Sequence, residues 1–259
     1  MKHLAIRLVA LCAAATLATA AQGADAVRNI AETRPSAAIA RKSYRAAGGV
    51  FGEYWWANRF LDKYNEVAAL KGKTVDLVMI GDSITHNWES LFTDGWAAFI
   101  KGRTVLNLGF GSDATQNVIW RLKHGELDGY TAKAVSLMIG TNNNGNEKSD
   151  PANVAEGVKA IVALIREKQP EAKILLHAIF PRGCSPESPD APKRRRNDAT
   201  NKILADFAKE DGNIVWIDLT KDLTGDDGWV PRSLLHKDET HPNAAGYVIW
   251  RKALEPYLK

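Results

Sequence analysis

The chain has 259 residues, of which 45% are hydrophobic and 25% charged, the composition of a globular protein with one large α/β domain or two small ones. Its formal charge of +4 is too small to indicate a particular partner. The two cysteines are Cys12 and Cys184, and Cys12 lies in a segment that we expect to be removed. An internal disulfide in the mature chain is therefore excluded.

Residues 1–23 are typical of a secretory signal peptide. Lys2 and Arg7 precede the apolar stretch 8–20, which is too short and too rich in alanine to span a membrane and ends in small residues. Leu11 stands before Cys12 where a lipoprotein signal would have a small residue, so we expect no stable membrane anchor. The sequence predicts an exported protein, periplasmic or extracellular, whose formal charge falls from +4 to +2 with the loss of Lys2 and Arg7.

The remaining chain is predicted to form a leader followed by one domain. Residues 24–50 have only weak periodicity and are expected to be loosely ordered. The spaced aromatic residues of 51–70 predict a helix on the outside of the domain. Because no repeat, low-complexity tract or linker interrupts residues 51–259, we expect a single domain over that range.

From residue 75 onward, apolar runs alternate with amphipathic segments. Strands are predicted at 76–80, 104–108, 134–139, 173–180 and 213–218. Helices are predicted at 88–100, 115–122, 153–168, 195–209 and 244–258. Continuous apolar strands separated by helices predict a five-stranded parallel sheet buried on both faces, in a three-layer α/β/α sandwich. The Pro-rich stretch 181–192 is predicted to be a surface loop, and the basic run 193–196 a solvated helix start rather than a nucleic-acid patch.

A serine follows the first core strand, at the edge of the sheet where ligands bind in such folds. The local sequence Gly-Asp-Ser-Ile-Thr, residues 81–85, places Ser83 at the carboxyl end of that strand. A serine hydroxyl becomes a good nucleophile when a neighbouring base removes its proton. The alternative interpretation of Ser83 is an ordinary helix N-cap.

A carboxylate and an imidazole share one short loop far downstream, at residues 238–242. The spacing of three residues lets Asp238 accept a hydrogen bond from Nδ1–H of His241, while Nε2 faces a nucleophile. Ser83, His241 and Asp238 are therefore predicted to form the catalytic triad of a serine hydrolase. The alternative is a helix-entry turn with an incidental histidine.

Two loops rich in glycine and asparagine offer donors to a developing oxyanion. They lie at 107–113 and 140–144, after the second and third core strands. We expect the backbone N–H of Ser112 and the side-chain amide of Asn142 to join the N–H of Ser83; ordinary turn chemistry is the alternative. No group of residues has the spacing of metal ligands, so we expect no metal and no cofactor.

These elements occur together and in order, and the sequence thereby resembles the SGNH (GDSL) hydrolase family. Ser83, Asn142 and His241 match the family's nucleophile, oxyanion asparagine and base, whereas its oxyanion glycine falls at Ser112. Segments 117–122, 125–127, 140–143 and 180–183 also resemble the catalytic subunits of platelet-activating-factor acetylhydrolases. The resemblance covers about residues 75–258 and implies a flavodoxin-like topology.

The resemblance further implies a serine esterase that works through an acyl-enzyme. Ile84, Thr141 and Thr240 would border an acyl pocket small enough to favour acetyl groups. Because the chain is expected to be exported, we expect an ester on a carbohydrate, with lysophospholipid or another lipid ester as the competing substrate class. A small-molecule or glycan ester is then the expected partner, and no nucleic acid.

Two hypotheses that assign the chain to other functional classes remain. Residues 109–114 fit Gly-x-Gly-x-x-Ala, a dinucleotide fingerprint, but they follow the second core strand of a chain expected to be exported. The other is a non-catalytic glycan-binding protein on a hydrolase fold. The presence of Ser83, Asn142, Asp238 and His241 argues against it.

Overall fold

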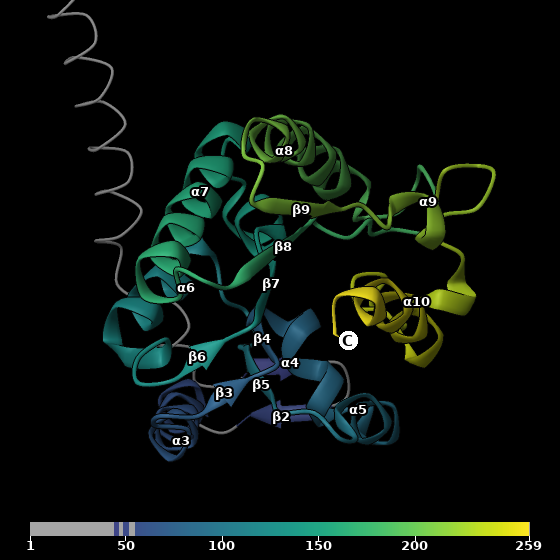
Figure 1. Cartoon of the computed structure of the whole chain (residues 1–259). Coiled ribbons are helices and arrows are strands. Elements are labelled where there is room, and N and C mark those ends of the chain that lie inside the picture. Colours follow the sequence, from purple (N-terminus) through teal and green to yellow (C-terminus); the bar gives the residue numbers. More distant parts are fainter. Residues whose placement is uncertain (1–43, 47–48, 52–54, 259) are drawn as a thin grey trace, which may run out of the picture.

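A five-stranded parallel sheet forms the centre of the molecule in the computed structural model, which describes residues 44–46, 49–51 and 55–258 (Figure 1). The strands are β4 (Leu77–Gly81), β5 (Val105–Gly109), β7 (Ala134–Met138), β8 (Lys173–His177) and β9 (Ile214–Ile217). Their order across the sheet is β5-β4-β7-β8-β9, and every neighbouring pair is parallel. All five predicted strands are confirmed, and the order is that of a flavodoxin-like fold.

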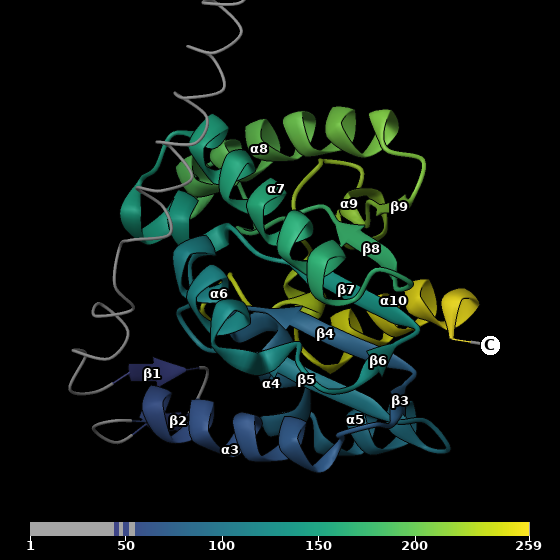
Figure 2. The same cartoon turned by 60° about the vertical axis from the view of Figure 1, so that its left-hand side comes forward.

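Helices cover both faces of this sheet because alternate strand residues point to opposite sides. In β4, Val78 and Ile80 belong to one buried apolar cluster, and Leu77 and Met79 to another. The first cluster is completed by α6 (Thr115–Arg121), α7 (Pro151–Lys168) and α8 (Ala191–Glu210). The second is completed by α4 (Ser83–Ser90), α5 (Thr93–Ile100) and α10 (Ala244–Leu254). Figure 2 shows the resulting three layers, which confirm the predicted α/β/α sandwich.

Three local predictions are wrong. The helix predicted at 88–100 is two helices: α4, which Asp82 caps and which begins at Ser83, and α5, which begins at Thr93 after a break at Leu91 and Phe92. Helix α8 begins at Ala191, four residues before the predicted start. The Pro-rich stretch is not entirely a surface loop, since Arg182 and Ser188 are buried.

Smaller elements surround the sandwich. Helix α3 (Trp55–Ala69) confirms the outer helix predicted at 51–70, and its Trp56 packs against Phe110 and Trp120. Two further sheets pair β1 (Tyr44–Ala46) with β2 (Gly49–Phe51), antiparallel, and β3 (Thr74–Val75) with β6 (Thr131–Ala132), parallel. The short helical turns are η1 (Leu122–Glu126), η2 (Asn143–Glu147), α9 (Thr220–Leu223), η3 (Arg232–Leu234) and η4 (Glu255–Tyr257).

The predicted signal peptide lies outside the described residues, as does most of the predicted leader, although β1 and the first two residues of β2 fall within the range 24–50. None of the helices in the described part of the chain is both long and apolar enough to cross a membrane. The carboxyl ends of β4, β5 and β7 meet at one edge of the sheet, and this edge carries Ser83, Ser112 and Asn142.

Candidate active site

Ser83 is the first residue of α4, at a sharp turn directly after β4. Asp82 caps the helix, because its Oδ1 accepts a 2.9 Å hydrogen bond from the N–H of Ile84. The N-cap role considered for Ser83 therefore belongs to its neighbour. The turn packs so closely that a Cβ at Gly81 would lie 2.1 Å from Oγ1 of Thr85 and 2.6 Å from the carbonyl oxygen of Met138.

Ser83, His241 and Asp238 form a continuous chain of hydrogen bonds. Oγ of Ser83 lies 2.7 Å from Nε2 of His241, and Nδ1 of His241 lies 2.7 Å from Oδ2 of Asp238. The other carboxylate oxygen, Oδ1, accepts from the backbone N–H groups of Thr240 at 2.9 Å and His241 at 3.0 Å. The tautomer that satisfies these contacts has a proton on Nδ1 and an acceptor at Nε2, which is what a base for the Ser83 hydroxyl requires.

The pKa values of the two carboxyl groups nearest Ser83 and His241 are shifted in opposite directions. Burial opposes ionisation of Asp238, but the hydrogen bond and charge of His241 and two backbone N–H donors hold the pKa of Asp238 well below its ordinary value. Asp238 is thus ionised at neutral pH and accepts the hydrogen bond from Nδ1 of His241 as a carboxylate. Complete burial raises the pKa of Asp82 to about 7, despite the N–H of Ile84. Its second oxygen has no hydrogen-bond partner within the described residues.

The two glycine- and asparagine-rich loops meet beside Ser83. Nδ2 of Asn142 donates a 2.9 Å hydrogen bond to the carbonyl oxygen of Asp113 and so joins the loop after β7 to the loop after β5. Ser112 has a φ of +65°, in the left-handed region that glycine adopts without strain. This conformation explains why glycine suits the position and shows that serine can also occupy it.

A buried charge network that the sequence did not reveal supports this loop. Oδ1 of Asp113 accepts a 2.7 Å hydrogen bond from the indole of Trp56, and Oδ2 accepts one of 2.9 Å from Arg121. Arg121 also binds Glu126 and lies 3.9 Å from the ring centre of Phe110. Burial raises the pKa of Asp113 to about 6 and that of Glu126 to about 7, against the lowering effect of Arg121.

The three residues expected to border an acyl pocket are not all alike in their surroundings. Thr141 and Thr240 both place their hydroxyl groups on Arg182, at 3.0 Å and 2.7 Å. The apolar side chain of Ile84, in α4, is instead buried in the apolar cluster on that face of the sheet. Arg182 is a site residue that the sequence did not predict, although it lies in the segment 180–183 that carries part of the family resemblance.

The basic run 193–196 is less solvated than predicted. Lys193 binds Asp190 at 2.7 Å, and Nη1 of Arg196 donates to the carbonyl oxygen of Asn144 at 3.3 Å. The guanidinium of Arg194 lies 5.0 Å from the ring centre of Trp229. These side chains thus support loops near the site.

A second serine–histidine pair lies in the core. Ser136 and His177 are 3.0 Å apart, both buried, and burial lowers the pKa of His177 to about 3. This pair lacks a carboxylate partner and solvent access, so it is structural.

Within the part of the chain that the structure describes, no three histidine, cysteine or acidic side chains are grouped as metal ligands would be.

Comparison with known proteins decides the family. The model of the GDSL-like lipase/acylhydrolase family matches residues 79–249. The chain is also 33% identical over 202 residues to platelet-activating factor acetylhydrolase IB subunit alpha2 of Rattus norvegicus, covering 78% of this chain and 84% of that protein. This chain belongs to the GDSL-like lipase/acylhydrolase family. It is therefore a carboxylic ester hydrolase.

Other relatives place this GDSL hydrolase within the same fold. It is 31% identical over 192 residues to platelet-activating factor acetylhydrolase IB subunit alpha1 of Homo sapiens, covering 74% of this chain and 79% of that protein. A GDSL-like lipase from Bacteroides thetaiotaomicron superposes with a TM-score of 0.64 at 17% identity, covering 77% and 96% of the two chains. A mutant acetyl-xylooligosaccharide esterase from Geobacillus superposes with a TM-score of 0.55 at 19% identity, covering 73% and 94%.

Proposed function

We propose that this hydrolase cleaves short-chain esters, acetyl esters first, with Ser83 as nucleophile, His241 as general base and Asp238 as the anion that orients His241. The observation that carries the proposal is the continuous hydrogen-bonded chain of these three side chains, with 2.7 Å at both links. His241 takes the proton of Ser83 as Oγ attacks the ester carbonyl. It then protonates the leaving alcohol, and water hydrolyses the acyl-enzyme by the same route.

The negative charge that develops on the carbonyl oxygen needs donors at fixed positions. We assign this role to the backbone N–H groups of Ser83 and Ser112 and to the side-chain amide of Asn142. The hydrogen bond from Asn142 to the carbonyl oxygen of Asp113 supports the assignment, because it fixes the amide where the loops after β5 and β7 meet. Each such donor typically lowers the barrier by about 3 kcal/mol.

We propose an acetylated carbohydrate as the substrate and an exported location. Two observations support this. The relatives that are 31–33% identical are named acetylhydrolases, which favours a small acyl group. The expected signal peptide argues against a role in intracellular phospholipid signalling. Lipid acetyl-ester hydrolysis is the second candidate, and the same relatives favour it through their name, platelet-activating factor acetylhydrolase.

The first experiment tests the nucleophile. Purified mature protein is assayed on p-nitrophenyl acetate with the variants Ser83→Ala and Ser90→Ala, which change the same side chain at the two ends of α4. We expect Ser83→Ala to abolish turnover and labelling by a serine-directed phosphonate, whereas Ser90→Ala keeps both. Full esterase activity in Ser83→Ala would contradict the mechanism. Failure of the phosphonate to label wild-type Ser83 would instead favour a glycan-binding protein.

The second experiment tests the substrate. Acetate release is measured on a panel of acetylated glycans and acetylated phospholipids, together with p-nitrophenyl esters of increasing acyl length. We expect acetate to be released faster from the glycans and the acetyl ester to be turned over faster than the octanoyl ester. Faster release from the phospholipids would favour the second candidate. Faster octanoate turnover would contradict a small acyl pocket.

A further inference from the structure

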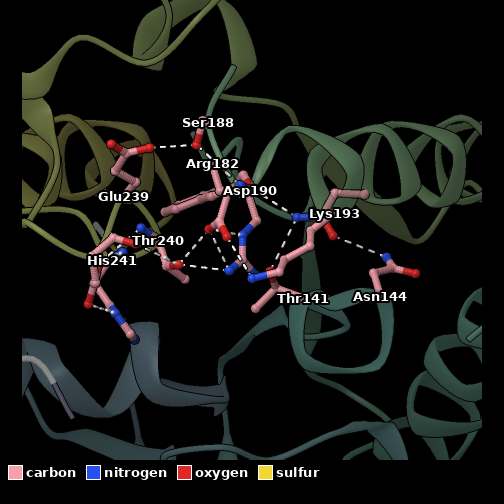
Figure 3. Close-up of polar contacts among 12 residues, drawn as sticks. Thr141, Asn144, Arg182, Ser188, Asp190, Lys193, Glu239, Thr240 and His241 are labelled. Carbon is pink, nitrogen blue, oxygen red and sulfur yellow. Dashed lines mark hydrogen bonds and ion pairs between the residues drawn. The ribbon is translucent and has the colours of Figure 1, made fainter. Parts of the chain in front are cut away.

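Arg182 lies at the meeting point of three loops of the site (Figure 3). It follows β8, it is buried, and its side chain extends between Thr141 and Thr240. Thr141 immediately precedes Asn142. Thr240 immediately precedes His241 and lies two residues after Asp238. One guanidinium group therefore contacts the loop that carries Asn142 and the loop that carries Asp238 and His241.

The donors of Arg182 are directed at protein acceptors. Nε donates to Oδ2 of Asp190 at 2.6 Å, Nη1 to Oγ1 of Thr141 at 3.0 Å and Nη2 to Oγ1 of Thr240 at 2.7 Å. Oγ1 of Thr240 in turn donates to Oδ2 of Asp190 at 2.8 Å. Thr240 is thus held from two sides, and the charge of Arg182 is balanced by Asp190. This arrangement is that of a group that fixes loops, not of one that awaits an anionic substrate.

Asp190 is the anion that holds this cluster together. Burial opposes its ionisation, but the charge of Arg182 and hydrogen bonds from Lys193, Thr240 and Arg182 keep the pKa of Asp190 below its ordinary value. A carboxylate that stays ionised forms the strong, short hydrogen bonds characteristic of charged pairs. The loop that carries His241 has one more support on this side, because the N–H of Gly183 donates to the carbonyl oxygen of Glu239 at 2.8 Å.

The loop that carries Asp238 and His241 contains a strained backbone, which contacts from other segments must hold in place. Glu239 has a φ of +55°, in the left-handed region, which costs a non-glycine residue free energy. The strained residue lies between Asp238 and Thr240, and the loop must present Asp238 and His241 at hydrogen-bonding distance from each other and from Ser83. A displacement of about 1 Å in catalytic groups can lower a rate about 100-fold.

We propose that Arg182 is a positioning residue, which acts through the hydroxyl of Thr240 to hold the loop of Asp238 and His241 in line with Ser83, and through Thr141 to tie that loop to the one carrying Asn142. This inference rests on the proposed function. It gives Thr240 a role different from the one that the family resemblance implies. A residue of the acyl pocket changes which acyl chain is preferred, whereas a positioning residue changes the turnover of all chains equally.

Thr240→Val is the informative variant, because it removes the hydroxyl, keeps the shape of the side chain and leaves the Arg182–Asp190 ion pair intact. We expect kcat on p-nitrophenyl acetate to fall about 10- to 100-fold, with KM within about twofold of wild type. The ratio of acetate to butyrate turnover should not change. Thr240→Ser restores the hydroxyl and should recover kcat to within about threefold of wild type.

The matched control is Thr224→Val. The Thr224 hydroxyl also makes one short hydrogen bond, 2.8 Å to the carbonyl oxygen of Thr220, but it lies at the end of α9. This variant loses the same group and should keep wild-type kcat. A second variant, Arg182→Gln combined with Asp190→Asn, removes both charges together so that neither is left buried and unpaired. It should lower kcat at least about tenfold.

A measurement without substrate separates this inference from the proposed function. The proton between Nδ1 of His241 and Asp238 is followed as a low-field resonance in one-dimensional NMR spectra, which we expect to weaken or shift in Thr240→Val and to be retained in Thr240→Ser. An unchanged resonance, a kcat within threefold of wild type, or an altered acyl-chain ratio in Thr240→Val would each overturn the positioning role. Absence of esterase activity in the wild type would overturn only the proposed function.

Discussion

The indole N–H of Trp56 donates a 2.7 Å hydrogen bond to Oδ1 of Asp113, although the two residues are 57 positions apart. Trp56 belongs to α3, outside the central sandwich, and Asp113 belongs to the loop after β5 that carries Ser112. The carbonyl oxygen of Asp113 holds Asn142. The outer helix is thus connected to the proposed oxyanion site through Asp113, whose carboxylate binds Trp56 and whose backbone carbonyl binds Asn142.

Trp56→Phe is expected to reduce both stability and turnover. Removing the indole N–H leaves a buried carboxylate oxygen without its donor, which should lower the free energy of unfolding by about 1–3 kcal/mol. A looser Asp113 should lower kcat about tenfold through Asn142, with little change in KM. Urea unfolding and steady-state kinetics measure the two effects. Trp120→Phe is the control, because Trp120 packs in the same aromatic group; a loss of kcat as large in this control would contradict the argument.

Ser112→Gly is expected to stabilise the protein. The left-handed backbone at Ser112 costs a residue with a Cβ about 1–2 kcal/mol, and the extra entropy that glycine loses on folding offsets part of the gain. We expect the free energy of unfolding to rise by about 0.5–1 kcal/mol in urea titrations. Because the proposed donor is the backbone N–H, kcat should stay within about threefold of wild type. Ser112→Ala keeps the Cβ and should give no such gain.

A loss of about 100-fold in kcat for Ser112→Gly would mean that the side chain, and not the backbone, contributes to catalysis. The matched Ser112→Ala variant would then show a comparable loss. A gain in stability that is equal in both variants would contradict the assignment of strain to the positive φ.

The sequence alone predicted the parallel sheet and the order in which the proposed catalytic groups follow its strands. Buried parallel strands are continuous apolar runs, so β4 and β7 were visible without any knowledge of their partners. The spacing of Asp238 and His241 is local, and it predicted the contact that the loop makes. Because the carboxyl ends of parallel strands meet at one edge, the positions of Ser83 and Asn142 after two such strands predicted that they would be close.

Buried charged residues were not predictable in the same way. Charged side chains are usually exposed, and Arg121 and Arg182 lie in segments that resemble a helix surface and a loop. Their burial depends on carboxylates five to eight residues away, Asp113 and Glu126 for the first and Asp190 for the second, which reach the arginine only through the way the chain turns between them. The break between α4 and α5 was missed because apolar residues continue through it, as Leu91 and Phe92 show.

Asp238→Asn is expected to remove most activity while keeping the fold. The amide can still accept a hydrogen bond, but it does not stabilise a protonated His241 and it favours the wrong tautomer. We expect kcat to fall about 10³- to 10⁴-fold. The control is Asp218→Asn, since Asp218 accepts from the N–H of Thr220 in the same kind of turn that Asp238 forms with Thr240. Turnover within tenfold of wild type in Asp238→Asn would exclude a catalytic role for this carboxylate.

Asp82→Asn is expected to alter how stability depends on pH. Burial raises the pKa of Asp82 to about 7, whereas an aspartate in the unfolded chain has a pKa of about 3.8. Between these two values the folded protein binds more protons than the unfolded chain, so this group's contribution to stability is complete below pH 4 and is lost as the pH rises to 7. Asparagine caps α4 as well as aspartate does but does not ionise. The variant should match the wild type near pH 4 and exceed its free energy of unfolding by about 2–4 kcal/mol at pH 8.

Urea unfolding at pH 4, 6 and 8 measures this difference. His241, Asp113 and Arg182 also act on Asp82, but they are present in both proteins, so comparing the wild type with the variant isolates the one carboxyl group. A stability difference that is the same at all three pH values would mean that Asp82 is ionised throughout. The raised pKa would then be wrong, and a buried anion would have to be stabilised within the turn that presents Ser83, which would bring a second negative charge close to the proposed nucleophile.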